Sequence, residues 1–577
     1  MSRLTTCVLL GTLIACSSDI PCTVPHDCPV SQRCMNGNCA EPNGTPGNLG
    51  DACKSNADCP SGLTCTSEAF GYPGGYCTAA CADASACGAN GACTPIGSTK
   101  VCTPTCSRDA QCRQGYGCCA TLADTCVPLA ACPLPACVRP VVDSALPAAQ
   151  VQKFGTHRVG DEVTFTVPAN TGSLTIVQQA QIASLTIVYR GTVLDNSAVP
   201  LSITLPDGGL AYDDLDGGPA VNPSPDGGID PSGEYAFYGG GTPSTVAFTV
   251  PNTSTSLTGG IPEGTWKFKV NDYAYECTLA NVSGCTDGGT LDNTYEVSVL
   301  TRPAVGGSTM AADFYIVADM NNGSGQPLTA ANAGTDPSVL RMEKTYKDLM
   351  TRAGITANVT FRDVSANDRA RFGTNISAQA TGPCDELSQM FTLSGQNPGN
   401  TMNVFLVQGL RSASSGGGTV VGIDGTIPGP SSYNGTVHSG AVVSAVDLFA
   451  SNLQNCPASG FEVGACGPDR VAYIAAHETG HFLGLFHTTE QEGADFDPLN
   501  DTAKCPCTSC ASPPDRPNCG SPSSASQPSL TNNLCLSPGA GCGGGDNLMF
   551  WFLQPGGPLG NITAQQAQVM RLNPVVQ

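Results

Sequence analysis

The stretch His477-Glu478-Thr479-Gly480-His481-Phe482-Leu483-Gly484-Leu485-Phe486-His487 holds three of the chain's six histidines. His477 and His481 are four residues apart, so on a helix they lie on one face, where two imidazoles can bind one Zn²⁺ at about 2.0–2.1 Å. Glu478 lies beside them and can act as a general base toward a metal-bound water. Gly484 lets the chain leave the helix, and the turn brings His487 back as a third ligand. Three protein ligands with an open fourth position predict a catalytic zinc site.

The residues before the motif are typical of a buried helix, with apolar side chains at Val471, Ile474, Ala475 and Leu483. Asp469 follows Pro468 and can cap the start of this helix. The uncharged stretch 482–486 would exclude water, which strengthens the electrostatic effect of a metal. The alternative is a helix with surface histidines and no metal. The fixed spacing of Gly484 and His487 makes that alternative a poor explanation.

The pattern HExxHxxGxxH resembles the signature of the metzincin metallopeptidases. That family has a methionine turn beneath its zinc, and the best match here is Asn547-Leu548-Met549-Phe550-Trp551. An ordinary core methionine is the alternative for Met549. Residues 308–577 most resemble the pappalysin group. That resemblance rests on His487-Thr488, Asn500-Asp501-Thr502, the Asn-x-Met turn, and the closing pattern Thr563-x-x-Gln566…Met570-Arg571.

The resemblance implies a zinc endopeptidase that acts on a protein or peptide substrate. It also implies calcium near the site, for which Asp495, Asp497 and Asp501 are the candidate ligands, with Asn500 and Thr502 beside them. One position departs from the family. Pappalysins carry a tyrosine two residues after the turn methionine to help stabilise the transition state, whereas this chain has Trp551, which can donate one hydrogen bond but has no phenolic oxygen. Either Trp551 takes over this role imperfectly, another donor acts in its place, or activity is reduced. Another metzincin group, astacin-like or reprolysin-like, is a second enzymatic alternative.

Composition limits the class of protein. A chain of 577 residues should hold three or four domains. The net charge of −22 argues against nucleic acid and anionic membrane surfaces as partners. The 32 cysteines indicate an oxidising compartment.

The N-terminus agrees with export. Residues 1–3 carry a positive charge, and residues 4–15 are apolar but too short to span a bilayer. They end in Leu13-Ile14-Ala15-Cys16, which resembles the lipobox of bacterial lipoproteins. We expect a signal peptide over 1–15, lipid attachment at Cys16, and display at the outer membrane or cell surface. The lipid would be the only membrane anchor. An ordinary secretory signal is the alternative.

Residues 16–137 form a cysteine-rich region with four repeats. In each repeat three cysteines are six apart and a fourth follows: 22/28/34/39, 53/59/65/77, 81/87/93/102 and 106/112/118/126. Units this small need disulfides to be stable. We expect a stalk, a spacer or an adhesive region. Cys119, Cys132 and Cys137 lie outside the pattern, and one of them could inhibit the zinc as a thiolate.

Residues 138–305 predict an antiparallel, jelly-roll-like β-sandwich. Short runs rich in Val, Thr, Ile and Phe alternate with turn residues at 162–167, 173–177, 184–189, 245–250, 264–270 and 295–300. Cys277 and Cys285 are expected to close a local loop. The acidic loop 207–230 is either solvated or a Ca²⁺ site.

Residues 306–577 predict an α/β metallopeptidase domain. Strands are expected at 312–318, 355–364, 402–410, 420–423 and 439–445, and helices at 338–353 and 383–392. The resemblance implies that the strand just before the zinc helix lies at the sheet edge, where a peptide can pair with it. Cys505, Cys507, Cys510, Cys519, Cys535 and Cys542 favour disulfides over a second zinc.

Together these features predict a secreted or surface-anchored zinc endopeptidase. The alternative from another class is a surface adhesin or binding protein whose peptidase domain is weakly active or decayed, which Trp551 favours. The complete set of ligands and base argues against decay.

Overall fold

The computed structural model divides into two compact units, Met1–Pro133 and Leu134–Gln577. It describes residues 22, 25, 28–29, 31–96, 99–106, 111–113, 116–119, 122, 125–128, 131, 141–180, 193–213, 245–278, 281–287, 294–303, 306–378, 386–411, 420–450, 453–520, 527–553 and 560–577. Cys16, Cys132, Cys137 and residues 214–230 of the acidic loop lie outside these ranges. In the described part, no helix has the length and apolar character needed to cross a membrane.

The first unit is rich in disulfides, as predicted. Its short antiparallel hairpins are β1 (Arg33–Met35) with β2 (Asn38–Ala40), β3 (Thr64–Thr66) with β4 (Tyr76–Thr78), β5 (Gly91–Ile96) with β6 (Thr99–Pro104), and β7 (Tyr116–Cys119) with β8 (Thr125–Pro128). In the first three repeats the first cysteine bonds the third and the second bonds the fourth: 22–34, 28–39, 53–65, 59–77, 81–93 and 87–102. The fourth repeat shows Cys112–Cys126.

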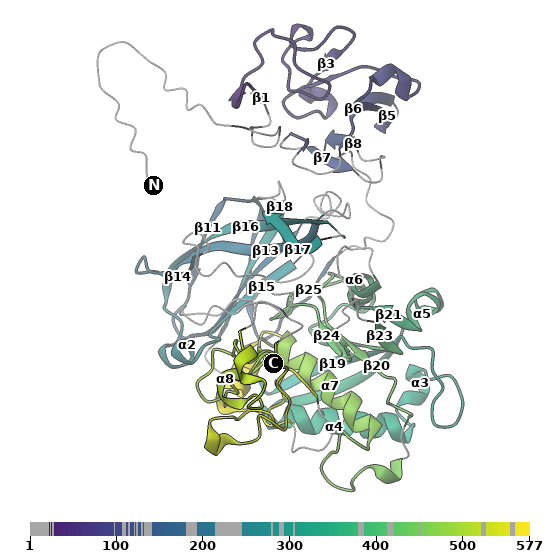
Figure 1. Ribbon diagram of the computed structural model, residues 1–577, viewed down its shortest axis with the longest axis vertical. Helices are drawn as coiled ribbons and strands as arrows, with labels where there is room; N and C mark the ends of the chain where they lie inside the picture. The colour runs from purple at the N-terminus through teal and green to yellow at the C-terminus, as the bar shows by residue number, and fades with distance from the viewer. Residues whose placement is uncertain are drawn as a thin grey trace. The chain divides into compact units, whose positions relative to one another are not determined.

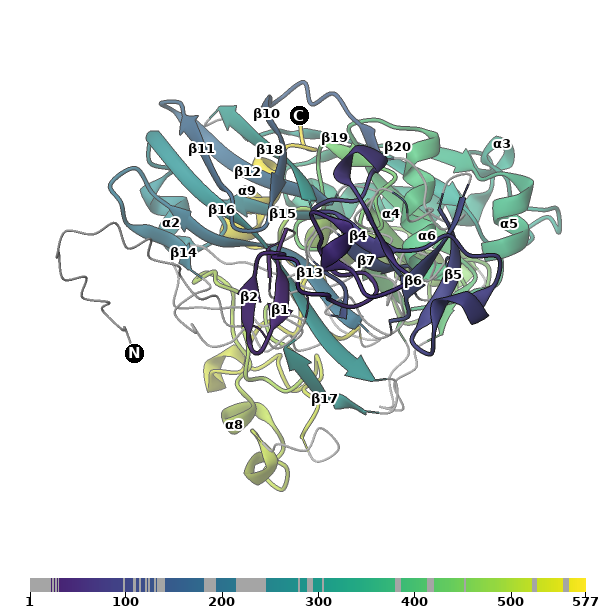
Figure 2. The same cartoon turned by 90° about the horizontal axis from the view of Figure 1, so that it is seen from above.

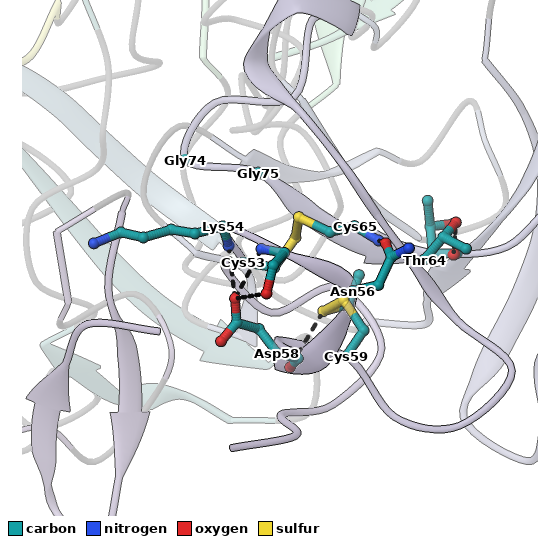
Figure 3. The surroundings of a disulfide bond; sticks show 12 residues. Cys53, Lys54, Asn56, Asp58, Cys59, Thr64, Cys65, Gly74 and Gly75 are labelled. Atoms are coloured by element: carbon teal, nitrogen blue, oxygen red, sulfur yellow. Dashed lines mark hydrogen bonds between the residues drawn. A yellow bond between two sulfur atoms is a disulfide. The ribbon is translucent and has the colours of Figure 1, made fainter. Parts of the chain in front are cut away.

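Figure 3 shows how one repeat is completed around its disulfides. The Asp58 carboxylate accepts the backbone N–H groups of Lys54 and Ser55, each at 2.9 Å, so a buried acid replaces regular structure as the partner of these donors. Cys119, expected as a spare thiol, is disulfide-bonded. This finding corrects the prediction that Cys119 could inhibit a zinc ion, because a disulfide sulfur is no thiolate.

The described residues between 150 and 303, the two-sheet region of the second unit, form two antiparallel sheets around one apolar core. One sheet has the order β10 (Gln150–Arg158), β18 (Thr294–Pro303), β12 (Thr171–Ala180), β15 (Thr245–Val250). The other has the order β11 (Glu162–Val167), β16 (Gly264–Thr278), β13 (Val193–Thr204), β14 (Leu210–Asp213), with β17 (Asn281–Asp287) beside β16. Phe165, Trp266 and Phe268 of the second sheet share a core with Ile176, Phe248 and Val297 of the first.

Most of the strands predicted here are present, and those at 162–167 and 245–250 coincide with β11 and β15. The predicted strand at 184–189 lies outside the described residues. So do the side chains of Cys277 and Cys285. The helix α2 (Ser254–Gly259) follows β15 and begins with a capping box between Thr253 and Ser256.

A five-stranded mixed sheet forms the centre of the remaining region. Its order is β20 (Thr356–Asp363), β19 (Thr309–Ile316), β22 (Thr401–Val407), β26 (Ala441–Ser444), β24 (Gly422–Asp424). The first four strands are parallel, and β24 is antiparallel to β26. The strand just before the motif helix was expected at the edge. In the structure that strand, β26, is internal, and the earlier strand β24 takes the edge because it pairs back onto β26.

Helices cover both faces of this sheet. Phe314, Val404 and Val443 face α4 (Pro337–Arg352) and α7 (Gly467–Phe482), whereas the alternating residues Tyr315 and Phe405 face α6 (Glu386–Phe391). Figure 1 shows α4 and α7 side by side. The shorter elements are α3 (Ala330–Ala333), α5 (Ala366–Phe372), β21 (Asn375–Ser377), β23 (Gly409–Arg411) and α8 (Cys507–Cys510).

Asp469 does not cap α7 as expected. The helix begins at Gly467 with Cys466 as its N-cap residue, so Asp469 lies inside the first turn. Its buried carboxylate accepts hydrogen bonds from Arg341 Nε at 2.6 Å and Nη2 at 2.7 Å, and from Thr345 Oγ1 at 2.6 Å. Asp469 therefore joins α7 to α4.

β9 (Val142–Asp143), just before the two-sheet region, pairs with β25 (Tyr433–Asn434), and Ser298 Oγ of β18 lies 2.8 Å from the Tyr433 hydroxyl. The closing helix α9 (Ala564–Leu572) begins with the capping box of Thr563 and Gln566. Figure 2 shows α9 beside β12 and β18. After α7 the chain is rich in loops, which the disulfides Cys505–Cys535, Cys507–Cys519 and Cys510–Cys542 hold together. These six cysteines are thus not a second zinc site.

Candidate metal centre

The helix α7 and the turn after it position the three motif histidines. His477 and His481 lie one turn apart on α7, which ends at Phe482. Gly484 then has φ +108°, a left-handed conformation that favours glycine. This turn reverses the chain and brings His487 next to the other two histidines, as the sequence predicted.

The three Nε2 atoms converge on one point. His477 and His481 are 3.1 Å apart at Nε2, His481 and His487 are 3.0 Å apart, and His477 and His487 are 3.2 Å apart. Three tetrahedral ligands at the usual Zn–N distance would be separated by about 3.3–3.4 Å. The triangle of nitrogens therefore fits a zinc ion after a shift of a few tenths of an ångström.

Each ring has an acceptor for its other nitrogen. His477 Nδ1 lies 2.6 Å from the Leu548 carbonyl, and His481 Nδ1 lies 2.7 Å from the Leu485 carbonyl. His487 Nδ1 lies 2.9 Å from Glu490 Oε1. An Nδ1–H that donates to these oxygens leaves a lone pair on every Nε2. Three facing lone pairs cannot satisfy one another, whereas a cation satisfies all three.

Burial keeps two of these rings neutral. Desolvation, followed by the neighbouring His487, lowers the pKa of His477 to about 3. The same causes hold the pKa of His481 well below its ordinary value. Neutral imidazole is the form that binds a metal ion. These two histidines can therefore bind a metal ion near neutral pH without first losing a proton.

Glu478 packs against the edge strand β24. Its side chain is 7% exposed and accepts the backbone N–H of Asp424. Gly422 makes this approach possible, because an added Cβ there would lie 2.4 Å from Glu478 Oε1. Burial, and then the charge of Asp424, raises the pKa of Glu478 well above its usual value. A cation at the three histidines would favour the charged form again.

Asp424 is a second carboxyl group on this side of β24. Ile423 packs toward the opposite face of the sheet, so its neighbour Asp424 points toward α7. Burial raises the pKa of Asp424 to about 7. Its Oδ2 atom has no hydrogen-bond partner among the described residues. Gly422 and Asp424 were not identified from the sequence, because only the pairing of β24 brings them to the motif.

Met549, the methionine of the predicted turn, packs against α7 beside the motif. It is fully buried, and its Sδ would be 2.4 Å from a Cβ added to Gly480, the residue just before His481. The Met549 carbonyl accepts the N–H of Thr488 at 2.9 Å, next to His487. The turn thus contacts the chain beside both ends of the ligand set.

Comparisons with known proteins add little to this geometry. No protein-family model matches the chain, and no curated protein matches it. One solved structure with detectable similarity is the crystal structure of metalloproteinase-II from Bacteroides fragilis, which is 13% identical. The match covers 36% of this chain and 60% of that chain with a TM-score of 0.17. A score this low carries no argument about fold or activity.

Trp551 uses its indole N–H within the loops that follow α7. Its indole N–H donates to the Leu530 carbonyl at 2.8 Å, and its ring packs on the cysteine-rich loops. An indole has one donor. The expectation that Trp551 helps to stabilise a transition state therefore gains no support from its position.

The three candidate calcium ligands are not brought together. Among the described residues, no cluster of three close acidic or histidine ligand atoms includes Asp495, Asp497 or Asp501. Asp497 is buried and paired with Lys504, and Asp501 accepts Thr563 Oγ1 at 2.8 Å and the Gln565 N–H at 2.9 Å at the start of α9. Two of these carboxylates thus have protein partners in place of an ion.

Proposed function

We propose that this chain is a zinc endopeptidase whose ligands are His477, His481 and His487. The observation that carries the proposal is the convergence of three Nε2 atoms, one of a buried and two of half-buried histidines, each left as an acceptor because its own Nδ1 is hydrogen-bonded. Zinc bound there would polarise a peptide carbonyl and lower the pKa of a water molecule. Three ligands leave room for both.

Glu478 is the general base in this proposal. It is adjacent to the first ligand, buried, and held in place by the Asp424 N–H. It would take the proton of the attacking water and pass it to the leaving nitrogen, so that hydroxide is added to the carbonyl carbon as the C–N bond breaks. Because a nearby cation lowers the pKa of a carboxyl group, Glu478 would be charged and able to accept a proton near neutral pH when a metal is bound.

The edge strand β24 offers a place for an extended substrate. In the described part of the chain β24 pairs with β26 alone. A peptide that added to its other edge would lie beside Glu478, which already contacts this strand. Recognition through the substrate backbone favours an endopeptidase over an enzyme that reads a chain end.

The finer assignment rests on the sequence resemblance. We propose a metzincin of the pappalysin type, with a jelly-roll-like accessory region at 138–305, exported and anchored by lipid at Cys16. Calcium at Asp495, Asp497 and Asp501 stays a prediction that their present partners do not favour. The alternative is a surface adhesin with a weak peptidase, which the engaged N–H of Trp551 supports.

Cleavage of casein and of a peptide library by the purified full chain tests the proposal. We expect cleavage that a chelator abolishes and added Zn²⁺ restores, with products identified by mass spectrometry. Stoichiometric zinc without any cleavage would favour the adhesin. Failure to bind zinc at all would overturn the metal centre itself.

A further inference from the structure

We propose that the closing helix α9 positions the metal ligands, with Gln566 as the positioning residue that connects it to His477. This inference rests on the proposed zinc site and adds a role for the C-terminal part of the chain. It follows from a continuous series of hydrogen bonds that runs from Gln566 through Asn547 and the Leu548 carbonyl to His477.

The first step is a reciprocal amide pair. Gln566 is fully buried, and its Nε2 donates to Asn547 Oδ1 at 3.1 Å while its Oε1 accepts from Asn547 Nδ2 at 2.9 Å. The Gln566 Oε1 atom also accepts the N–H of Thr563 at 3.0 Å, which fixes the side chain to the start of α9. A joint flip of both amides would keep the pair but lose the bond from Thr563, so the Thr563 N–H selects one orientation.

The second step joins Asn547 to the ligand. Asn547 Oδ1 also accepts the N–H of Met549 at 2.8 Å, which sets the conformation of the methionine turn. That conformation aims the Leu548 carbonyl at His477 Nδ1, 2.6 Å away. This bond decides which nitrogen of His477 keeps its proton and where its Nε2 points.

The third step is the attachment of α9 to the two-sheet region. Three groups of the two-sheet region bind this helix and its end. Ser254 Oγ donates to Gln565 Oε1 at 2.5 Å, and Ser173 Oγ donates to the Leu572 carbonyl at 2.7 Å. Arg302, which is 4% exposed, donates from Nη1 to the Asn573 carbonyl at 2.8 Å. The two-sheet region is thus a support of the metal centre and not an independent appendage.

Replacement of Gln566 by methionine tests the series. Methionine has a similar length and can neither donate to Asn547 nor replace the bond to Thr563. The matched control is Gln568→Met, at an exposed glutamine of the same helix. Both full-length variants and the parent would be titrated with Zn²⁺ against a chromophoric chelator. Each would also be loaded with Co²⁺, whose visible spectrum reports coordination geometry.

We expect Gln566→Met to bind Zn²⁺ about 10- to 100-fold more weakly, as is typical when a group behind a metal ligand is lost. Its saturated Co²⁺ spectrum should also differ from that of the parent, whereas Gln568→Met should match the parent in both. A role in stability alone would lower the melting temperature and leave the saturated Co²⁺ spectrum unchanged.

Parent-like affinity and spectrum in folded Gln566→Met would overturn the inference. If that variant does not fold, Gln566→Glu replaces it, because glutamate keeps the acceptor for Thr563 and Asn547 and loses only the donor. A parent-like site in that variant would overturn the inference equally. The parent titration separates the two proposals: an absence of zinc binding there defeats the proposed function, whereas unchanged variants defeat only the role of α9.

Discussion

His487 and Glu490 form a histidine–carboxylate pair behind the candidate metal centre, with Nδ1 2.9 Å from Oε1 and 3.0 Å from Oε2. The other two ligands rest on backbone carbonyls. A carboxylate behind an imidazole raises the basicity of the ligand and fixes its orientation. His487, which comes from a turn and not from α7, therefore has the strongest support of the three.

Glu490→Ala should weaken Zn²⁺ binding by about 10- to 100-fold, and Glu490→Gln, which keeps an acceptor, should weaken it less. Competition with a chromophoric chelator measures both. Glu492→Ala is the matched control, because it removes the same charge from the same loop, where Glu492 contacts Asp495. Equal affinities for the Glu490 and Glu492 variants would show that the pair does not support the metal.

Gly480→Ala should destabilise the protein by about 1–3 kcal/mol, the usual cost of adding a methyl group to a packed core. The added Cβ would meet Met549 Sδ at 2.4 Å. The direction of the change in unfolding free energy is informative, because a glycine-to-alanine substitution inside a helix otherwise stabilises a protein by about 0.5–1 kcal/mol.

Urea denaturation of the metal-free chain measures this effect. Gly334→Ala is the control, because a Cβ there has no neighbour within 4 Å among the described residues. A Gly480 variant as stable as this control would mean that Met549 does not pack beneath the motif.

His477 should stay neutral in the folded, metal-free protein down to about pH 4, because burial lowers its pKa to about 3. The folded pKa is below the unfolded value of about 6.5. The unfolded chain therefore takes up the proton first, and His477 opposes folding progressively as the pH falls from about 6.5 to about 3. Above that window it contributes no pH dependence.

The protonation of His477 can be measured from its imidazole NMR chemical shifts in the metal-free protein between pH 4 and 8. The same protein in urea is the reference, in which histidine should titrate near about 6.5. A midpoint near that value for His477 in the folded protein would contradict the burial of the site.

The sequence predicted that the three motif histidines come together because they are local. His477, His481 and His487 are related by one helix and one turn, so their spacing alone brings them together. The strands and helices around α7 were also predicted within a few residues, since their apolar periodicity is regular. Met549 came from the family resemblance and not from any spacing rule.

What the sequence missed depends on contacts between distant residues. Gly422 and Asp424 reach Glu478 only because β24 folds back on β26. Asp469 was expected to cap α7, but its partner is Arg341 on α4, 128 positions earlier. Gln566 and Asn547 are hydrogen-bonded to each other, but glutamine and asparagine occur in so many structural contexts that the sequence does not predict this contact. No local pattern encodes such pairs.

The most direct test of the central claim is the Glu478→Ala variant. Zinc content and peptide-library cleavage would be measured on the parent and the variant, prepared and loaded in the same way. We expect both to hold one zinc and only the parent to cleave, because the three histidines bind the metal and Glu478 moves the proton. A zinc-loaded Glu478→Ala variant that cleaves peptides at the parent rate would contradict the account.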